Sequence, residues 1–277
     1  MVNMSRRVLF QYLNTQVRLI VATAMLGGLS TPACTTFLLA GSDHVLFCNN
    51  EDSKYSHTRV WFVPAANGRL GCVYVGLWNE WAQGGMNSKG VAFDGVAGIS
   101  LDGVTNAVPV AIQSKMVKVR GNPSERMLES CGSVDEAVSF YQSHGEPTFS
   151  YATIVVADRT GAIAVIGNKA GRLHFSKGAG PAAWGWNGGL AAELIAQDST
   201  PVIPNAAAIL DAARSRDEYA TKYSNVFDLT TGDIVLFDFS RGSSGITFRL
   251  AEELGKGRHH FRMHLLWQQA ARKVKGP

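Results

Sequence analysis

Short stretches in which hydrophobic and polar residues alternate, separated by turn residues, run through most of the chain after residue 33. This pattern predicts β-strands joined as hairpins. The clearest pairs flank turns at 41–44, 158–161 and 230–233. We predict strands at 35–40, 45–48, 60–63, 70–76, 91–98, 152–157, 162–167, 225–229 and 234–239, and a glycine-rich turn at 84–90.

Helical signals occur in separate blocks. Ser133 stands three residues before Glu136, a spacing typical of a capping box, and predicts a helix that runs to about residue 144. Further helices are expected at 124–130 and 206–214, and the basic stretch 256–275 is expected to form an amphipathic helix with one solvated face. Hairpins and helices in separate blocks predict an antiparallel α+β fold, and no linker divides it, so we predict one domain over 34–277.

The first 33 residues have the pattern of a secretory signal peptide. Arg6, Arg7 and Arg18 precede or flank an uncharged apolar run at 19–29, and small residues follow up to Ala33. We therefore predict cleavage after Ala33 and a periplasmic or secreted protein. The run is too short for a stable membrane anchor, which needs about 20 apolar residues. A buried N-terminal helix is the alternative interpretation.

Composition narrows the function classes further. The chain has 277 residues, of which 46% are hydrophobic and 17% are charged. Removing the first 33 residues, which hold three arginines and no acidic residue, lowers the formal net charge from +4 to +1. A clustered positive face for nucleic acid is therefore not expected. No motif indicates a metal or an organic cofactor, so none is predicted.

Four cysteines occur, at positions 34, 48, 72 and 131, and their spacing fits no zinc or redox motif. We expect buried thiols for most of Cys48, Cys72 and Cys131, because free cysteine behaves as a small hydrophobic residue. Some pairing among these three stays open.

Cys34 would become the first residue after cleavage and would then carry its own α-amine. A thiolate is the attacking species, and an α-amine with a pKa of about 7.7–8.0 is able to take the thiol proton. Cys34 is therefore the candidate catalytic nucleophile. The alternatives are a structural cysteine or a lipidated one, although lipoprotein signals normally place leucine where Thr31 stands.

Three ordered motifs carry a resemblance to a known family. They are Cys34-Thr35-Thr36-Phe37, then the segment 47–52 (FCNNED), then the segment 84–95 (GGMNSKGVAFDG); the later segment 223–229 (YSNVFDL) agrees with them. Together they resemble the choloylglycine hydrolase family, which includes penicillin V acylases and bile salt hydrolases. The resemblance implies an N-terminal nucleophile hydrolase fold, a four-layer αββα sandwich of two antiparallel sheets between helix layers. It also implies a homotetramer and hydrolysis of a linear amide through an acyl-enzyme on Cys34.

The resemblance also assigns roles to individual residues. Asp52 matches the family aspartate that supports the α-amine and the thiol, and Asn187 is the candidate second oxyanion-hole residue; the alternatives are turn residues in both cases. Asn49 stands where the family usually has arginine, and Ala97 falls near the first oxyanion-hole asparagine. The family's late arginine has no clear match.

The predicted substrate is a small-molecule acyl amide such as penicillin V, a conjugated bile salt or a fatty acyl amide. Asn49, Trp78, Trp81 and Phe93 are the candidate substrate-binding residues, although aromatic residues at such spacings are often part of the core. Because Asn49 and Ala97 depart from the family pattern, a catalytically inactive binding protein on the same scaffold is the alternative. An acyltransferase that uses the same acyl-enzyme is a further one.

Overall fold

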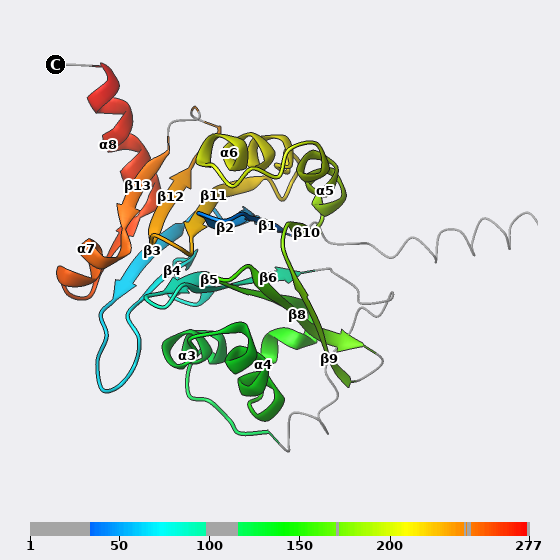
Figure 1. Cartoon of the computed structure of the whole chain (residues 1–277). Helices are drawn as coiled ribbons and strands as arrows, with labels where there is room; N and C mark the ends of the chain where they lie inside the picture. Colours follow the sequence, from blue (N-terminus) through cyan, green and yellow to red (C-terminus); the bar gives the residue numbers. More distant parts are fainter. Residues whose placement is uncertain (1–33, 98–115, 170–171, 241, 243–244, 276–277) are drawn as a thin grey trace, which may run out of the picture. The chain divides into compact units, whose positions relative to one another are not determined.

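The computed structural model describes residues 34–97, 116–169, 172–240, 242 and 245–275, and this part of the chain forms two antiparallel sheets with helices on both outer faces (Figure 1). One sheet has six strands in the order β10-β1-β2-β11-β12-β13, and the other has eight in the order β14-β3-β4-β5-β6-β7-β8-β9. The strands are β1 (Thr35–Ala40), β2 (Val45–Asp52), β3 (Thr58–Val63), β4 (Cys72–Leu77), β5 (Ala82–Asn87), β6 (Val91–Ala97), β7 (Ala152–Asp158), β8 (Ala162–Lys169), β9 (Arg172–Ala179), β10 (Ala182–Gly185), β11 (Thr221–Asp228), β12 (Asp233–Phe237), β13 (Ile246–Arg249) and β14 (His259–Arg262).

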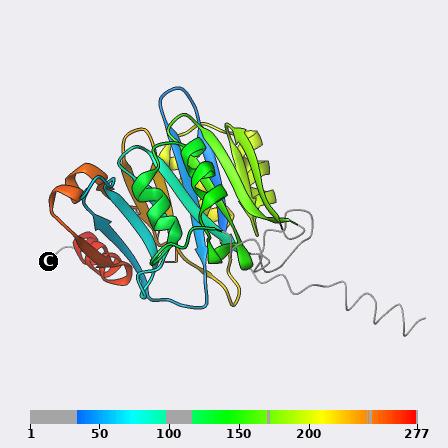
Figure 2. The same cartoon turned by 90° about the horizontal axis from the view of Figure 1, so that it is seen from below.

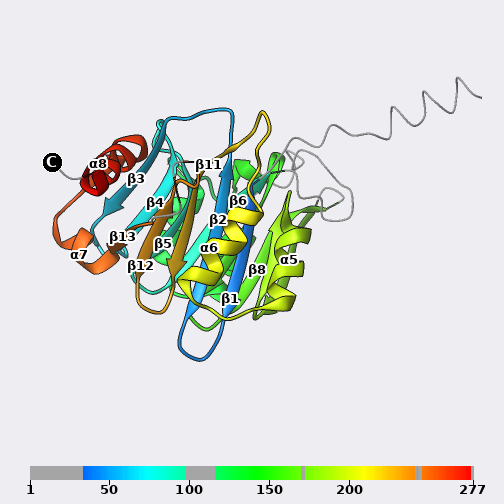
Figure 3. The ribbon, with the colours of Figure 1, turned by 90° about the horizontal axis from the view of Figure 1, so that it is seen from above.

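Helices cover each sheet on the side away from the other sheet. Seen from below, α3 (Pro123–Ser130) and α4 (Val134–Ser143) lie on the eight-stranded sheet (Figure 2). Seen from above, α5 (Gly188–Gln197) and α6 (Ile203–Ala212) lie on the six-stranded sheet (Figure 3). The remaining helical segments are η1 (Pro147–Ser150), α7 (Leu250–Gly255) and α8 (Met263–Lys275).

Three hydrophobic clusters hold these layers together. The central cluster lies between the two sheets and contains Leu38 and Phe47 from one sheet and Phe62 and Val75 from the other. A second cluster joins the eight-stranded sheet to α3 and α4, and a third joins the six-stranded sheet to α5 and α6. The predicted four-layer αββα arrangement is therefore confirmed, because each sheet buries both of its faces.

The predicted hairpins are present. β1 and β2 pair around the turn 41–44, β7 and β8 around 159–161, and β11 and β12 around 229–232. The capping box is also confirmed, since the Ser133 hydroxyl accepts a hydrogen bond of 3.2 Å from the Glu136 N–H at the start of α4. Sequence periodicity and turn residues were sufficient for these elements.

The predicted glycine-rich turn at 84–90 is wrong, because its first half lies in strand β5. Gly84 and Gly85 do not form a turn. Their lack of a Cβ atom lets neighbouring atoms pack directly against the β5 backbone. A Cβ atom on Gly84 would stand 2.4 Å from an Asp94 carboxyl oxygen, and one on Gly85 would stand 2.6 Å from the Val73 carbonyl oxygen. The turn itself is limited to residues 88–90, where Gly90 has a φ of 77°.

The prediction of one helix over 256–275 is also partly wrong. Residues His259–Arg262 form the edge strand β14, which pairs with β3, and only Met263–Lys275 is helical. Strands β9, β10 and β13 and helices α5 and α7 were not predicted. Helix α5 begins at a glycine pair that has the sequence of a turn and lacks a side-chain cap. The predicted leader 1–33 and the end of the strand 91–98 lie outside the described residues.

Asn87, at the end of β5, ties the two-sheet body to α3. Its Nδ2 donates to the carbonyl oxygens of Leu128 (2.7 Å) and Cys131 (2.8 Å), and its Oδ1 accepts from the N–H groups of residues 89 and 91. Because these groups are buried, Asn87→Ala should lower the free energy of unfolding by about 3 kcal/mol or more. Urea unfolding measures this, with the exposed Asn79→Ala as control; equal losses would contradict the prediction.

Candidate active site

Cys34 stands at the start of β1, at one end of the sandwich, and lines a cavity of about 200 Å³. The side chain is 7% exposed and belongs to the cluster between the two sheets. Residues from β2, from the β4–β5 connection and from β6 line the cavity beside it, and the exposed Tyr55 and Tyr151 lie at its mouth. None of the described residues that line this cavity is basic.

Glu51 is the immediate neighbour of Cys34 on β2. Thr35 pairs with Asn50 in the antiparallel β1–β2 ladder. Continuing this register by one residue places Cys34 opposite Glu51. The Cys34 thiol is within hydrogen-bonding contact of the Glu51 carboxyl group, and the Tyr223 hydroxyl donates to Glu51 Oε2 at 3.4 Å. Glu51 is only 4% exposed, so a thiol and a carboxyl group share a buried site.

A second row of polar side chains lies behind this pair, on the face that points toward the other sheet. Thr36, Asn49 and Asn225 stand opposite one another on β1, β2 and β11, and the Thr36 hydroxyl donates to Asn49 Oδ1 at 3.2 Å. Asp94 reaches this region from β6, and all four residues are 0% exposed. Both Asp94 oxygens, Asn49 Nδ2 and both side-chain polar atoms of Asn225 lack a hydrogen-bond partner among the described residues.

The acidic surroundings determine the protonation of this site. Burial, and then the negative charges of Glu51, Asp94 and Asp52, raise the pKa of the Cys34 thiol well above its usual value; the Asp52 N–H partly offsets this. Burial and the charge of Asp52 raise the pKa of Glu51 to about 8. Burial and the charge of Glu51 likewise raise the pKa of Asp94. No basic residue among those described in the cavity lining favours the thiolate and the carboxylates, although the charge of Lys222 lowers the pKa of Asp52.

Asp52 lines the same cavity and lies next to Cys34 through its backbone N–H. Its side chain accepts a hydrogen bond of 2.5 Å from the Thr221 hydroxyl, while Oδ2 has no partner among the residues described. Burial raises the pKa of Asp52 to about 7 although the Thr221 bond lowers it. The structure thus brings the predicted pair Cys34 and Asp52 together.

The predicted substrate-binding residues divide into three groups. Trp81 and Phe93 line the Cys34 cavity. Asn49 is fully buried in the polar row and does not line it. Trp78, which is 61% exposed, lines a separate surface pocket with Arg59 and Arg262.

The two positions that the family resemblance assigns to the oxyanion hole differ in where their side chains lie. Ala97, at the end of β6, lines the Cys34 cavity. The backbone of Asn187 lies near Cys34, because the N–H group of the preceding residue, Trp186, donates to the Cys34 carbonyl oxygen at 3.3 Å. The Asn187 side chain, however, donates to the Ala213 carbonyl oxygen at 2.9 Å and is not among the residues that line the cavity. Its catalytic role stays a prediction.

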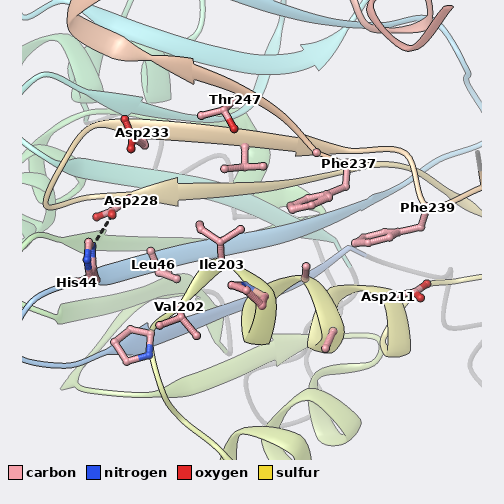
Figure 4. Close-up of a pocket in the computed structure, with 16 residues that line it drawn as sticks. His44, Leu46, Val202, Ile203, Asp211, Asp228, Asp233, Phe237, Phe239 and Thr247 are labelled. Atoms are coloured by element: carbon pink, nitrogen blue, oxygen red, sulfur yellow. Dashed lines mark hydrogen bonds and ion pairs between the residues drawn. The ribbon is translucent and has the colours of Figure 1, made fainter. Parts of the chain in front are cut away.

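A larger groove of about 840 Å³ lies elsewhere, between α6 and the outer face of β12 and β13 (Figure 4). Its floor is apolar, with Leu46, Ile203 and Phe237 pointing into it, and it shares no residue with the Cys34 cavity. His44 and Asp228, joined at 2.7 Å, lie at one end. The described residues of this groove include no cysteine or serine, whereas the smaller cavity holds the Cys34 thiol beside Glu51 and Asp52. The smaller cavity is therefore the candidate active site.

Sequence reasoning missed Glu51, Asp94 and Tyr223 as site residues, although all three lie in the quoted motifs. A signal was present for Glu51 and Asp94. Alternate residues of a strand face the same side. Glu51 therefore faces the same side as Asn49 of the polar row, and Asp94 the same side as Ala92 and Val96 of the central cluster. The prediction ended the second strand at Cys48, which concealed the inward-facing position of Glu51.

All four cysteines are buried free thiols, as expected for most of them. Among the described residues, no group of three or more histidine, cysteine, aspartate or glutamate side chains could hold a metal ion. Within the same ranges, no helix has both the length and the apolar character needed to cross a membrane.

Comparisons with known proteins agree with this architecture. No protein-family model and no curated protein matches the sequence. Among solved structures, the penicillin V acylase from Agrobacterium tumefaciens superposes with a TM-score of 0.61 and 11% identity, over 80% of this chain and 87% of that one. A mutant of the conjugated bile acid hydrolase from Clostridium perfringens superposes with a TM-score of 0.57 and 15% identity, over 82% and 96%. The chain therefore shares the fold of these two proteins, in agreement with the fold that its resemblance to the choloylglycine hydrolase family implies.

Proposed function

We propose that this chain is an exported hydrolase of linear, non-peptide amides, with Cys34 as the nucleophile that forms a thioester acyl-enzyme. The observation that carries the proposal is the position of Cys34: a thiol immediately before β1, beside two buried acids and in the lining of a cavity. The penicillin V acylase and the bile acid hydrolase that share the fold support the amide bond as the target.

Cleavage after Ala33 is part of the proposal. It would create an α-ammonium group on Cys34, the residue whose thiol contacts the Glu51 carboxyl group and the Asp52 N–H group. Such a charge favours the ionised forms of neighbouring carboxyl and thiol groups. The processed chain would thus gain the positive charge that the described lining of the cavity lacks.

In the reaction, the Cys34 sulfur attacks the amide carbonyl carbon, the C–N bond breaks with protonation of the nitrogen, and water then hydrolyses the thioester. Asp52 holds the α-ammonium. Backbone N–H groups at the end of the sheet, among them that of Asp52, stabilise the oxyanion. Asn187 would join them only after its side chain leaves the hydrogen bond to the Ala213 carbonyl oxygen. An oxyanion donor is typically worth about 3–4 kcal/mol.

The cavity also restricts the acyl group. Trp81, Phe93 and Ile154 supply apolar surface, while Ser124 and Asn122 supply polar groups to the lining. Pockets for drug-sized ligands have volumes of about 300–1,000 Å³. A cavity of about 200 Å³ favours a compact acyl group, such as a phenoxyacetyl group, over a fused-ring one.

Detection of the acyl-enzyme tests this function. Purified exported protein should begin at Cys34 by N-terminal sequencing, and it should release amine from compact N-acyl amides. Acid quenching during turnover should give a mass increase equal to the acyl group on the peptide that begins at Cys34. A chain that begins elsewhere, or an acyl group on another residue, would contradict the proposal.

A binding protein that has lost activity is the second candidate, because the acids around Cys34 raise its thiol pKa and no basic residue lies in the described cavity lining. The same experiment separates the two functions. A binding protein would hold the N-acyl amide without release of amine and without any acylated peptide.

A further inference from the structure

The residues around the Cys34 thiol restrict which group takes its proton. Sequence reasoning gave this role to the α-amine of Cys34, as in other enzymes with an N-terminal nucleophile. In this chain the α-amine would stand among three carboxyl groups, those of Glu51, Asp52 and Asp94, whose charges all act on Cys34. Nearby negative charge favours the ammonium form, and an ammonium group has no lone pair to accept a proton.

Glu51 has the contacts of a proton acceptor. Its carboxyl group is within hydrogen-bonding contact of the Cys34 thiol, and the Tyr223 hydroxyl donates to it at 3.4 Å from the opposite strand. These contacts hold the carboxyl group at the sulfur in a site that is 4% exposed. A general base must lie within hydrogen-bond reach of the proton that it removes, and Glu51 meets this condition.

The titratable groups around Glu51 determine which of them loses its proton first as pH rises. They are Cys34 immediately before β1, Asp52 from β2, Tyr223 from β11 and Asp94 from β6. The pKa of Glu51 is about 8, whereas burial raises those of Cys34 and Tyr223 well above their usual values. Glu51 therefore loses its proton before the thiol does, which leaves a carboxylate in contact with a neutral S–H group.

We propose that Glu51 is the catalytic base that accepts the Cys34 thiol proton, and that the α-ammonium group of the processed chain acts as its charge partner. This rests on the proposed function, in which Cys34 is the nucleophile. The S–H proton moves to a Glu51 oxygen as the sulfur bonds to the carbonyl carbon. The same proton passes to the amide nitrogen as the C–N bond breaks. Water then attacks the thioester, gives one proton to Glu51, and that proton returns to the sulfur as the acid product leaves.

The role assigned to Glu51 is specific to this chain's sequence. The segment 49–52 reads Asn-Asn-Glu-Asp, and the position that resembles the family arginine is Asn49. Asn49 and Glu51 face the same side of β2, toward the second sheet. In this chain an uncharged amide at position 49 and a carboxyl group at position 51 make this buried wall of the site acidic.

Thiol alkylation tests the proposal without any substrate. Two chains are compared, one that begins at Cys34 and one that keeps Ala33, so that the second lacks an α-amine on Cys34. The rate of iodoacetamide addition to Cys34 is followed by peptide mass from pH 5 to pH 10, with the buried Cys48, Cys72 and Cys131 as internal references. Each chain is prepared as wild type, Glu51→Gln and Glu51→Asp, with the buried Glu253→Gln as control; circular dichroism verifies folding.

We expect Glu51→Gln to lower the Cys34 alkylation rate at pH 8 by about 10-fold or more in both chains, because the S–H group loses its proton acceptor. In the wild type the rate should rise as Glu51 ionises near pH 8. Glu51→Asp should restore part of the rate, and Glu253→Gln should leave it unchanged. If the Glu51→Gln chain that begins at Cys34 reacts as fast as wild type while the chain that keeps Ala33 is inert, the amine is the base and the proposal is wrong. Absence of amide hydrolysis would contradict the proposed function alone, because alkylation needs no substrate.

Discussion

Replacing Cys34 by serine should lower amide turnover at least about 1,000-fold while the protein keeps its fold. Loss of the nucleophile in a catalytic unit removes most of the rate enhancement, and a serine hydroxyl is a much weaker nucleophile than a thiolate at neutral pH. The substitution changes one atom in a side chain that is 7% exposed, so the packing between the sheets is preserved. Turnover is measured as amine released from a compact N-acyl amide, and circular dichroism verifies the fold.

Cys131→Ser is the matched control for this prediction. Cys131 is also buried, at 5% exposure, but it follows α3 and packs in the cluster on the far side of the eight-stranded sheet. We expect turnover within about twofold of wild type in this variant, because it affects no residue of the proposed reaction. Full turnover by Cys34→Ser would show that another group attacks the amide, and the proposed mechanism would be wrong.

The sequence predicted the hairpins because they depend on local patterns, whereas the order of the layers was implied only by the family resemblance. The turn 41–44 and the alternation on both sides of it determine the β1–β2 pair, and the Ser133–Glu136 capping box determines the start of α4. These predictions required no knowledge of which elements would pack together.

The acidic environment of Cys34 could not be predicted in this way. The strand prediction stopped before Asn49 because polar residues normally mark the end of a buried strand. In the structure β2 continues to Asp52 because β1 and β11 pair with it on both sides and bury Asn49 and Glu51. Asp94 comes from a different sheet, so its effect on Glu51 depends on how the two sheets stack. Trp78 shows the converse error, since its position in the chain suggested the cavity but its side chain lines another pocket.

The buried acids also predict an unusual dependence of stability on pH. Asp94 is 0% exposed, both its oxygens lack a partner among the described residues, and burial followed by the charge of Glu51 raises its pKa. An unfolded aspartate has a pKa of about 3.9. Above that pH, and up to the raised value, the folded state holds a proton that the unfolded state has released. The free energy of unfolding therefore falls as pH rises through this interval.

Asp94→Asn should remove this loss, since an amide of the same shape carries no charge at any pH. In a chain that keeps Ala33, and so has no α-ammonium group near Asp94, we expect the variant to be more stable than wild type at pH 8 by about 2 kcal/mol, or about 5 °C in Tm. The difference should shrink at pH 4–5, where Asp94 is protonated in the folded state. In the chain that begins at Cys34 the gain should be smaller, because the ammonium group stabilises the carboxylates. Thermal unfolding across pH 4–9 measures this, with the exposed Asp43→Asn as control; a variant less stable than wild type at pH 8 in both chains would show that Asp94 is ionised and favourably paired in the folded protein.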